Sequence, residues 1–258
     1  MILYQLRKLY MKVGIIGGSG LDDPDMFKIE DEKDVFTNYG KPSSHLKFGK
    51  IEGNDVVLLA RHGIRHQYSP TQVNYRANIA ALKDAGVTHI LATTACGSLR
   101  GEIGRGHFVV LDQFIDFTRS RKNTFYESFE NGAVHTAMPE PFDAFLRDRL
   151  YKAGKEIGLE IHERGCVITE EGPRFATRAE SKMFRIWGAD VVNMSIAPEA
   201  MLACEAHIPY AAVAMATDYD SWKEDEEPVT WEQINEVFSR NAQNMIKLLK
   251  TTVAALGK

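Results

Sequence analysis

The chain of 258 residues has little cysteine, no long apolar run and no excess of basic residues, and each absence excludes a class of protein. Its three cysteines form no CxxC pair and cannot all pair with one another, which favours a reducing compartment, so we expect a cytoplasmic protein. No apolar run approaches the roughly 18 to 20 residues of a membrane-spanning helix, so we expect no membrane partner. A net charge of −4 argues against a nucleic-acid partner, because phosphate backbones are bound by clustered Lys and Arg.

Three common site motifs are also missing. The glycine cluster Gly17–Gly20 has Asp23 where a dinucleotide-binding fingerprint has its third glycine, and no GK[ST] follows it as in a Walker A loop. No GxSxG elbow occurs, since Ser19 is followed by Gly20 and Leu21, which disfavours a serine hydrolase.

What is present is the composition of one globular α/β domain. Hydrophobic residues make up 44% of the chain and charged residues 26%. Residues 1–10 are mixed apolar and basic, without the apolar core or cleavage site of a signal peptide. We therefore expect an N-terminal extension at 1–10 and a single domain at 11–258.

Short apolar runs alternate with amphipathic stretches along this domain. We expect strands at 12–16, 55–60, 89–93, 107–111, 166–168, 190–194 and 210–215, and helices at 74–85, 141–157, 178–187, 198–206 and 230–255. The alternation predicts an α/β fold in which a mixed, twisted central β-sheet is flanked by helices on both faces. Ligands of such sheets bind at the carboxyl ends of the strands.

Four predicted loops at strand ends are rich in hydrogen-bond donors: Gly17–Gly20 with Ser19, Arg61–His66, Thr93–Ser98, and Asn193–Glu199 with Ser195. Each alone is explained by an ordinary turn or helix cap. Together they supply the amide, hydroxyl and guanidinium groups that hold a small oxyanion. A metal site at His62 and His66 is disfavoured, because Gly63 interrupts the helix that would align them and no acidic ligand follows.

Two carboxylates follow the last predicted strand. Asp218 and Asp220 are two residues apart, so in an extended chain they face the same side and can converge on one ligand. Paired aspartates in this position also cap helices or face solvent, and the residues alone leave the ligand open.

Several motifs of the chain, taken in order, resemble those of one protein family. The set comprises Gly17–Asp23, Arg61–Gly63, Gly172–Phe175, Glu180, Trp187–Val191, Asn193–Ser195, Pro198–Glu199 and Ala216–Asp220. It is similar to the motifs of the 5′-methylthioadenosine phosphorylases, within the trimeric purine nucleoside phosphorylase family, and it covers the chain from about Val13 to the terminal helix. The resemblance implies the nucleoside phosphorylase fold, with inorganic phosphate as co-substrate, no other cofactor, no metal, and a homotrimer or a dimer of trimers.

The resemblance also implies roles for individual residues. The phosphate ligands would be Ser19, Arg61, His62, Thr94, the backbone of Ala95, and Ser195. Met194 would lie under the ribose and Phe175 against the purine, while Asp218 and Asp220 address the base and His135 reaches the 5′ pocket of a neighbouring subunit.

These roles imply a reaction in purine and methionine salvage. Phosphate attacks C1′ of S-methyl-5′-thioadenosine while Asp218, as general acid, protonates N7, which gives adenine and 5-methylthioribose 1-phosphate. Asp220 would accept from the 6-amino group, so that a 6-aminopurine is favoured over a 6-oxopurine.

The sequence departs from the family pattern at two positions. Ala176 stands where many members have Ser, and Trp231 replaces a small aliphatic residue near the 5′ substituent, beside Ile234. Trp231 is alternatively a core aromatic residue. Two other functions stay open: a phosphorylase of 6-oxopurine nucleosides or methylthioinosine, and a non-catalytic module that binds purine nucleosides.

Overall fold

The structure is a computed structural model that describes residues 11–17, 27–130, 132–225 and 230–257, apart from the side chains of residues 231, 233 and 235. The predicted extension at 1–10, Ser19 and the side chain of Trp231 therefore lie outside the described residues.

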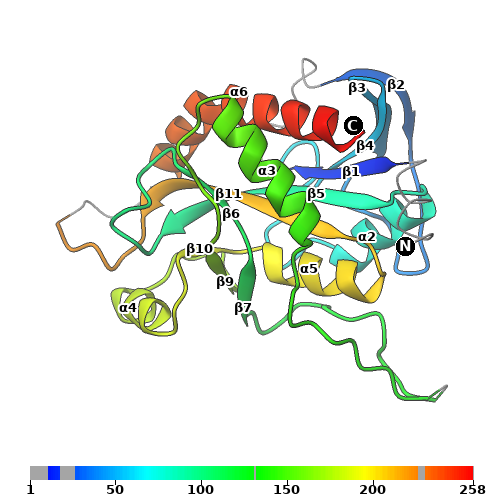
Figure 1. The fold of residues 1–258 in the computed structure, drawn as a ribbon. Coiled ribbons are helices and arrows are strands. Elements are labelled where there is room, and N and C mark those ends of the chain that lie inside the picture. Colours follow the sequence, from blue (N-terminus) through cyan, green and yellow to red (C-terminus); the bar gives the residue numbers. More distant parts are fainter. Residues whose placement is uncertain (1–10, 18–26, 131, 226–229, 258) are drawn as a thin grey trace.

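Within the described residues, an eleven-stranded mixed sheet forms the centre (Figure 1). Its strands are β1 (Lys12–Gly17), β2 (Lys28–Lys33), β3 (Leu46–Ile51), β4 (Asn54–Ala60), β5 (His89–Ser98), β6 (Phe108–Val110), β7 (Gln113–Phe117), β8 (Ile161–His162), β9 (Cys166–Glu170), β10 (Val191–Asn193) and β11 (Tyr210–Tyr219).

Two long strands form the middle of this sheet. The main path runs β2-β3-β4-β1-β5-β10-β9-β7, and β11 pairs in parallel with β5 along its whole length. β1 is parallel to both β4 and β5, whereas β10 is antiparallel to β5. The carboxyl ends of β4, β5 and β11 therefore point the same way, and this edge carries the site.

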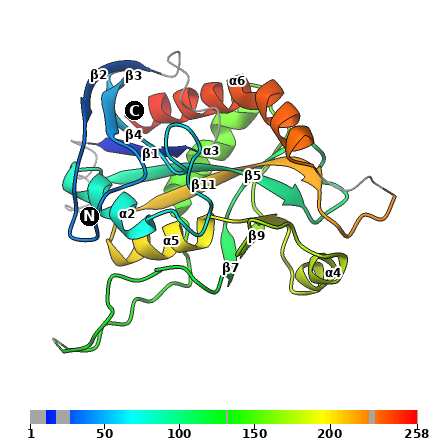
Figure 2. The ribbon, with the colours of Figure 1, turned by 180° about the vertical axis from the view of Figure 1, so that it is seen from behind.

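Helices cover both faces of the sheet, as the alternating pattern predicts (Figures 1 and 2). On one face, α2 (Tyr75–Asp84) packs beside α5 (Ile196–Glu205). On the other, α3 (Ala144–Glu156) packs beside α6 (Trp231–Leu256). The short α4 (Arg178–Ile186) lies at the far end, where Phe184 packs on Ile168 and Val192. The α/β single-domain prediction is confirmed.

Local sequence explains the helix ends. The side chains of Asn74, Asp143 and Thr177 accept hydrogen bonds from backbone N–H groups in the first turns of α2, α3 and α4. Thr177 and Glu180 form a reciprocal capping box, which ends the loop that carries Phe175. In α6, apolar residues at three- and four-residue steps, among them Met245, Leu249 and Val253, are fully buried.

Four strands and one strand end differ from the sequence-based expectation. β2, β3, β7 and β8 were not predicted; β2 (KIEDEK) is exposed along its length and carries no apolar signal. The residues Thr93–Ser98 were expected to form a loop, but they continue β5. The strand extends because β11 flanks it through Ser98 and β10 pairs with Gly97 and Ser98 on its other side. Within the described residues, no helix is long and apolar enough to cross a membrane.

Candidate functional site

A cavity of about 480 Å³ lies at the carboxyl edge of the central strands. Its wall comes from the loop after β4, from the ends of β5, β9, β10 and β11, and from the start of α6. Of the residues predicted for the site, those that line it are Arg61, His62, Thr94, Ala95, Phe175, Met194, Ser195, Asp218, Asp220 and Ile234. The fold thus brings together six segments that are far apart in sequence.

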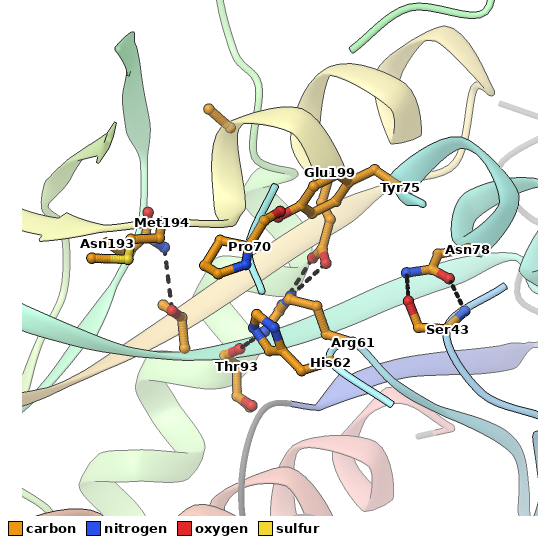
Figure 3. Close-up of polar contacts among 12 residues, drawn as sticks. Ser43, Arg61, His62, Pro70, Tyr75, Asn78, Thr93, Asn193, Met194 and Glu199 are labelled. Carbon is orange, nitrogen blue, oxygen red and sulfur yellow. Dashed lines mark hydrogen bonds and ion pairs between the residues drawn. The ribbon is translucent and has the colours of Figure 1, made fainter. Parts of the chain in front are cut away.

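Arg61 is the most deeply buried charge at one end of the cavity. Its Nε and Nη2 donate to the two carboxylate oxygens of Glu199 at 2.5 and 2.9 Å, and its Nη1 donates to the Thr93 carbonyl at 2.7 Å (Figure 3). Burial alone would lower the pKa of Arg61, but the Glu199 carboxylate raises it, so the guanidinium stays charged. Three of its five N–H groups are engaged, which leaves two for an anion.

The imidazole of His62 is neutral. Its Nδ1 lies 2.8 Å from the Tyr68 carbonyl, and because a carbonyl only accepts, Nδ1 carries the proton. Burial and the positive charge of Arg61 lower the pKa of His62 to about 3. Nε2 is therefore an acceptor, suited to a protonated phosphate oxygen or a sugar hydroxyl. His66 stacks on this ring with a centroid separation of 4.6 Å.

A chain of hydrogen bonds links β5 to the start of α5. Asn193 donates to Thr94 Oγ1 at 3.2 Å and accepts from Thr169 Oγ1 at 2.8 Å. The Thr169 hydroxyl in turn accepts the backbone N–H of Ala197. Ser195 is the N-cap of α5, yet its hydroxyl makes no capping hydrogen bond and lies against the cavity. Hydroxyls and a helix N-terminus therefore converge beside Arg61, as an oxyanion requires.

Asp218 defines the opposite end of the cavity. Its Oδ1 accepts from Thr217 Oγ1 at 2.7 Å, and its side chain is almost fully buried. Burial, reinforced by the charge of Asp220, raises the pKa of Asp218 to about 7, although the Thr217 hydrogen bond opposes the shift. A carboxyl with this pKa can give up a proton near neutral pH.

Asp220 lines the same cavity, and one of its carboxylate oxygens is unpaired among the described residues. Its Oδ2 is buried and has no hydrogen-bond partner among the described residues. Burial raises the pKa of Asp220, while hydrogen bonds from Ser181 and from the Ser221 N–H lower it. An orphaned buried carboxylate oxygen costs about 1 to 3 kcal/mol unless a ligand donates to it.

The floor under the two aspartates requires glycine. A Cβ added at Gly97 would lie 3.2 Å from Asp218 Oδ2, 3.2 Å from the Asp220 Cβ and 3.1 Å from Val192. The ladder between β11 and β5 shifts register between Ala216 and Asp218, which re-aims the end of β11 at this floor. Gly97, which has no side chain, and the aromatic ring of Phe175 both line the cavity, which suits a planar ring as ligand.

Comparison with known proteins connects this geometry to a family. The family model described as "Phosphorylase superfamily" matches residues 12–254. The chain belongs to the phosphorylase superfamily.

Relatives within the superfamily are close. The chain is 54% identical over 247 residues to the S-methyl-5′-thioadenosine phosphorylase of Xenopus tropicalis, covering 94% of this chain and 88% of that one. The Danio rerio enzyme of the same name is 51% identical over 247 residues, with 95% and 88% covered. Among solved structures, a methylthioadenosine phosphorylase from Schistosoma mansoni in complex with adenine superposes with a TM-score of 0.91 at 42% identity, covering 96% of this chain and 92% of that one.

Two residues predicted for substrate specificity in this superfamily member lie away from the cavity. Ala176 is buried in the small core beneath α4, with Leu99 and Phe184, and is absent from the cavity wall. Its neighbour Phe175 takes the wall position because successive residues of this extended segment face opposite sides. His135 is exposed on the segment between β7 and α3 and contacts Phe129, at 5.5 Å between ring centroids.

Several residues of the site were missed by sequence reasoning. Glu199 was noted only as part of a motif, and its pairing with Arg61 spans 138 positions, which no local pattern signals. Glu170 and Phe238 also line the cavity. The available signal for Glu170 was a pair of glutamates at the end of an apolar run, because alternation along the chain turns one of two neighbouring side chains inward. Among the described residues, no group of three His, Cys, Asp or Glu could hold a metal ion.

Proposed function

We propose that the protein is a pentosyltransferase that cleaves S-methyl-5′-thioadenosine with inorganic phosphate into adenine and 5-methylthioribose 1-phosphate. The observation that carries the proposal is the pair of buried carboxyls beside Gly97. Asp218 holds a proton near neutral pH, and Asp220 holds an unpaired acceptor. Adenine offers the complementary pair, with an acceptor at N7 and a donor at the 6-amino group.

The chemistry follows from this complementarity. A phosphate oxygen attacks C1′ as the C1′–N9 bond breaks, and the bonding electrons pass into the purine ring. Asp218 delivers its proton to N7, so adenine leaves as a neutral molecule and Asp218 ends as the carboxylate. Rate acceleration arises from positioning and from donors aimed at the developing charge.

The opposite end of the cavity supports the phosphate role. Among the described residues, Arg61 keeps two N–H groups without an acceptor, His62 offers an acceptor, and Ser195 offers a hydroxyl that makes no capping hydrogen bond at a helix N-terminus. The Thr94 hydroxyl donates to the Ala95 carbonyl and would turn toward a bound phosphate. Ser19 completes the proposed set. Met194 lines the same cavity and is the residue that we expect under the ribose.

Selection of the base is a matter of hydrogen-bond polarity. A 6-oxopurine would place its O6 lone pairs against the acceptor of Asp220, which leaves buried groups unpaired. Solved relatives from Schistosoma mansoni have been determined with adenine and with methylthioadenosine. Both the hydrogen-bond polarity of Asp220 and the ligands of the solved relatives favour a 6-aminopurine over the 6-oxopurine base of methylthioinosine.

The 5′ end and the assembly complete the proposal. Ile234 and Phe238 make an apolar wall suited to a methylthio group rather than a hydroxyl, and Trp231 starts the same helix.

We further propose a homotrimer or a dimer of trimers in which His135 enters the 5′ pocket of a neighbouring subunit. The reaction needs no metal or organic cofactor, since its donors and acid are all side chains or backbone. A purine-salvage role in the cytoplasm is part of the same proposal.

A substrate panel tests the function. Purified protein is assayed with S-methyl-5′-thioadenosine, adenosine, methylthioinosine and inosine, each with and without phosphate, and free base is quantified. We expect phosphate-dependent release of adenine, and at least tenfold higher kcat/KM for methylthioadenosine than for methylthioinosine. A preference for methylthioinosine would instead show a phosphorylase of 6-oxopurine nucleosides. Adenine binding without turnover would show a non-catalytic module that binds purine nucleosides.

A further inference from the structure

β9 ends at Glu170, and the next residue is a second glutamate, Glu171, with opposite surroundings. Glu171 accepts hydrogen bonds from the N–H groups of Arg119 and Ser120 and from the Thr71 hydroxyl. Burial opposes its ionisation, but these donors lower the pKa of Glu171 to about 2. Alternation along the strand turns Glu170 the other way, into the cavity. Glu171 thereby fixes the strand end from which Glu170 points.

Glu170 is buried. The residue is 6% exposed, and within the described part of the chain its carboxyl makes no hydrogen bond or ion pair. A buried carboxyl without a partner is destabilising, so it is retained where it serves a ligand.

The three cavity carboxyls come from two strand ends at one edge of the sheet. Asp218 lies on β11 and Asp220 directly follows it, while Glu170 ends β9, on the far side of β5 and β10, and all three residues line the cavity. The edge of adenine presents N7, the 6-amino group and N1 in that order. If Asp218 addresses N7 and Asp220 the amino group, Glu170 is the remaining carboxyl of the cavity wall that can meet N1.

We propose that Glu170 is a third base-recognising residue, whose protonated carboxyl donates a hydrogen bond to N1 of the adenine ring. The proposal rests on the proposed function of the same cavity. N1 of adenine is an acceptor, so it pairs with the protonated carboxyl and is repelled by the carboxylate. Glu170 therefore makes recognition of the 6-aminopurine depend on pH, separately from the acid catalysis of Asp218.

The surroundings of Glu170 favour the protonated form at neutral pH. Burial, and then the charge of Asp220, raise the pKa of Glu170 to about 8; Arg174 opposes the shift and Glu180 adds to it. Arg174 and Glu180 form a bidentate ion pair with both distances at 2.7 Å, so their charges largely cancel at Glu170. The neighbouring strand β7 presents the uncharged Phe117.

The test compares the wild type with Glu170→Gln and Glu170→Leu between pH 6.5 and 9.5. Gln donates to N1 at every pH, whereas Leu donates at none. At pH 7 we expect Glu170→Leu to lose threefold to tenfold in kcat/KM for methylthioadenosine, the value of one hydrogen bond, and Glu170→Gln to lose less. The ratio of Glu170→Gln to wild type rises as pH passes 8. Phosphate and Asp218 titrate in every variant, so this ratio isolates Glu170.

Two further measurements keep the test decisive. Adenine affinity is measured by calorimetry over the same pH range, and thermal melting confirms that each variant folds. Glu160→Gln, an exposed carboxyl outside the cavity, is the matched control and should follow the wild type. Equal adenine affinity and equal pH profiles for all variants would overturn the role of Glu170 even if the enzyme is active. An inactive wild type whose adenine affinity still depends on residue 170 would instead overturn the proposed reaction and keep the contact.

Discussion

At the scale of single residues, the site is defined by buried polar groups that the fold leaves unsatisfied. Asp220 Oδ2 has no partner among the described residues, and Asp218 is held in an environment that opposes its ionisation. Both arrangements reduce the stability of the empty protein. They become favourable when a base that accepts at one position and donates at the next occupies the cavity, so the site is preorganised for its ligand.

Substituting Asp218 separates these effects. Asp218→Asn can donate a hydrogen bond to N7 but cannot transfer a proton. We expect kcat/KM for methylthioadenosine to fall by about 10² to 10⁴. We also expect the wild type to lose activity as pH rises through 7, and the variant to lack this loss. Steady-state assays across pH 5.5 to 9 measure both. An alkaline limb that persists near pH 7 in the variant would assign it to another group.

The same substitution should stabilise the protein at high pH. The pKa of Asp218 is raised in the folded state, from near 4 to about 7. Its favourable contribution is thus complete below pH 4 and is lost as pH rises through 7. Asn lacks this dependence, so Asp218→Asn should gain stability over wild type at pH 8, with a ceiling of roughly 4 kcal/mol. Urea unfolding at pH 5 and pH 8 compares the two.

Residue types at strand ends predicted much of this site, but pairings between distant segments did not follow from them. Arg61, His62, Ser195 and Asp218 stand out because donors and acids cluster after apolar runs. The partner of Arg61 is Glu199, a residue in the helix after β10, and the sequence holds no sign that it meets the loop after β4. The inward side of Glu170 likewise depends on a register that only the sheet specifies.

At the scale of elements, one buried ion pair joins four of them. Arg61 follows β4, Glu199 lies on α5, Tyr210 on β11 donates to Glu199 at 2.9 Å, and Thr93 on β5 accepts from Arg61. Both charged side chains are essentially inaccessible to solvent. The pair therefore orients the guanidinium for phosphate and fastens α5 to the sheet.

Removing one member of this ion pair should destabilise the folded protein, whereas replacing both members together with apolar residues should not. We expect Glu199→Gln to reduce the free energy of unfolding by about 3 to 5 kcal/mol, because the Arg61 charge remains buried without its counter-ion. The double variant Arg61→Met with Glu199→Leu should recover most of that stability while phosphate binding stays lost. Urea unfolding and phosphate calorimetry measure the two properties. A double variant as unstable as the single one would show that the contact stabilises the fold directly.

Strong apolar patterns predicted the elements, and weak ones were missed. β1, β4 and β11 are buried runs and were placed within a few residues of their observed ends. β2 carries five charged residues in six, and among the described residues it joins the sheet through its pairing with β3 alone, so tertiary contacts decide its conformation. The extension of β5 through Ser98 has the same cause.

At the scale of the whole molecule, the segment between β7 and α3 projects from the body of the protein. It extends away from the sheet in both views (Figures 1 and 2). Its base is fastened by Glu205, which accepts from Thr124 and from the Phe125 N–H, while Phe129 and Val134 farther along are exposed. An anchored segment with exposed apolar residues favours an interface with another subunit.

His135 lies on this segment, outside the cavity of its own chain. If a trimer forms, a chain of 29.0 kDa should sediment at about three or six times that mass, and His135→Ala should raise KM for methylthioadenosine roughly threefold to tenfold. Co-expression of His135→Ala with Asp218→Asn then discriminates the source of the residue. In mixed oligomers the Asp218→Asn chain supplies its His135 to the intact Asp218 of its neighbour, so sites of wild-type KM reappear that neither variant forms alone. Activity equal to the sum of the separate variants would place His135 within its own subunit's function or outside the site altogether.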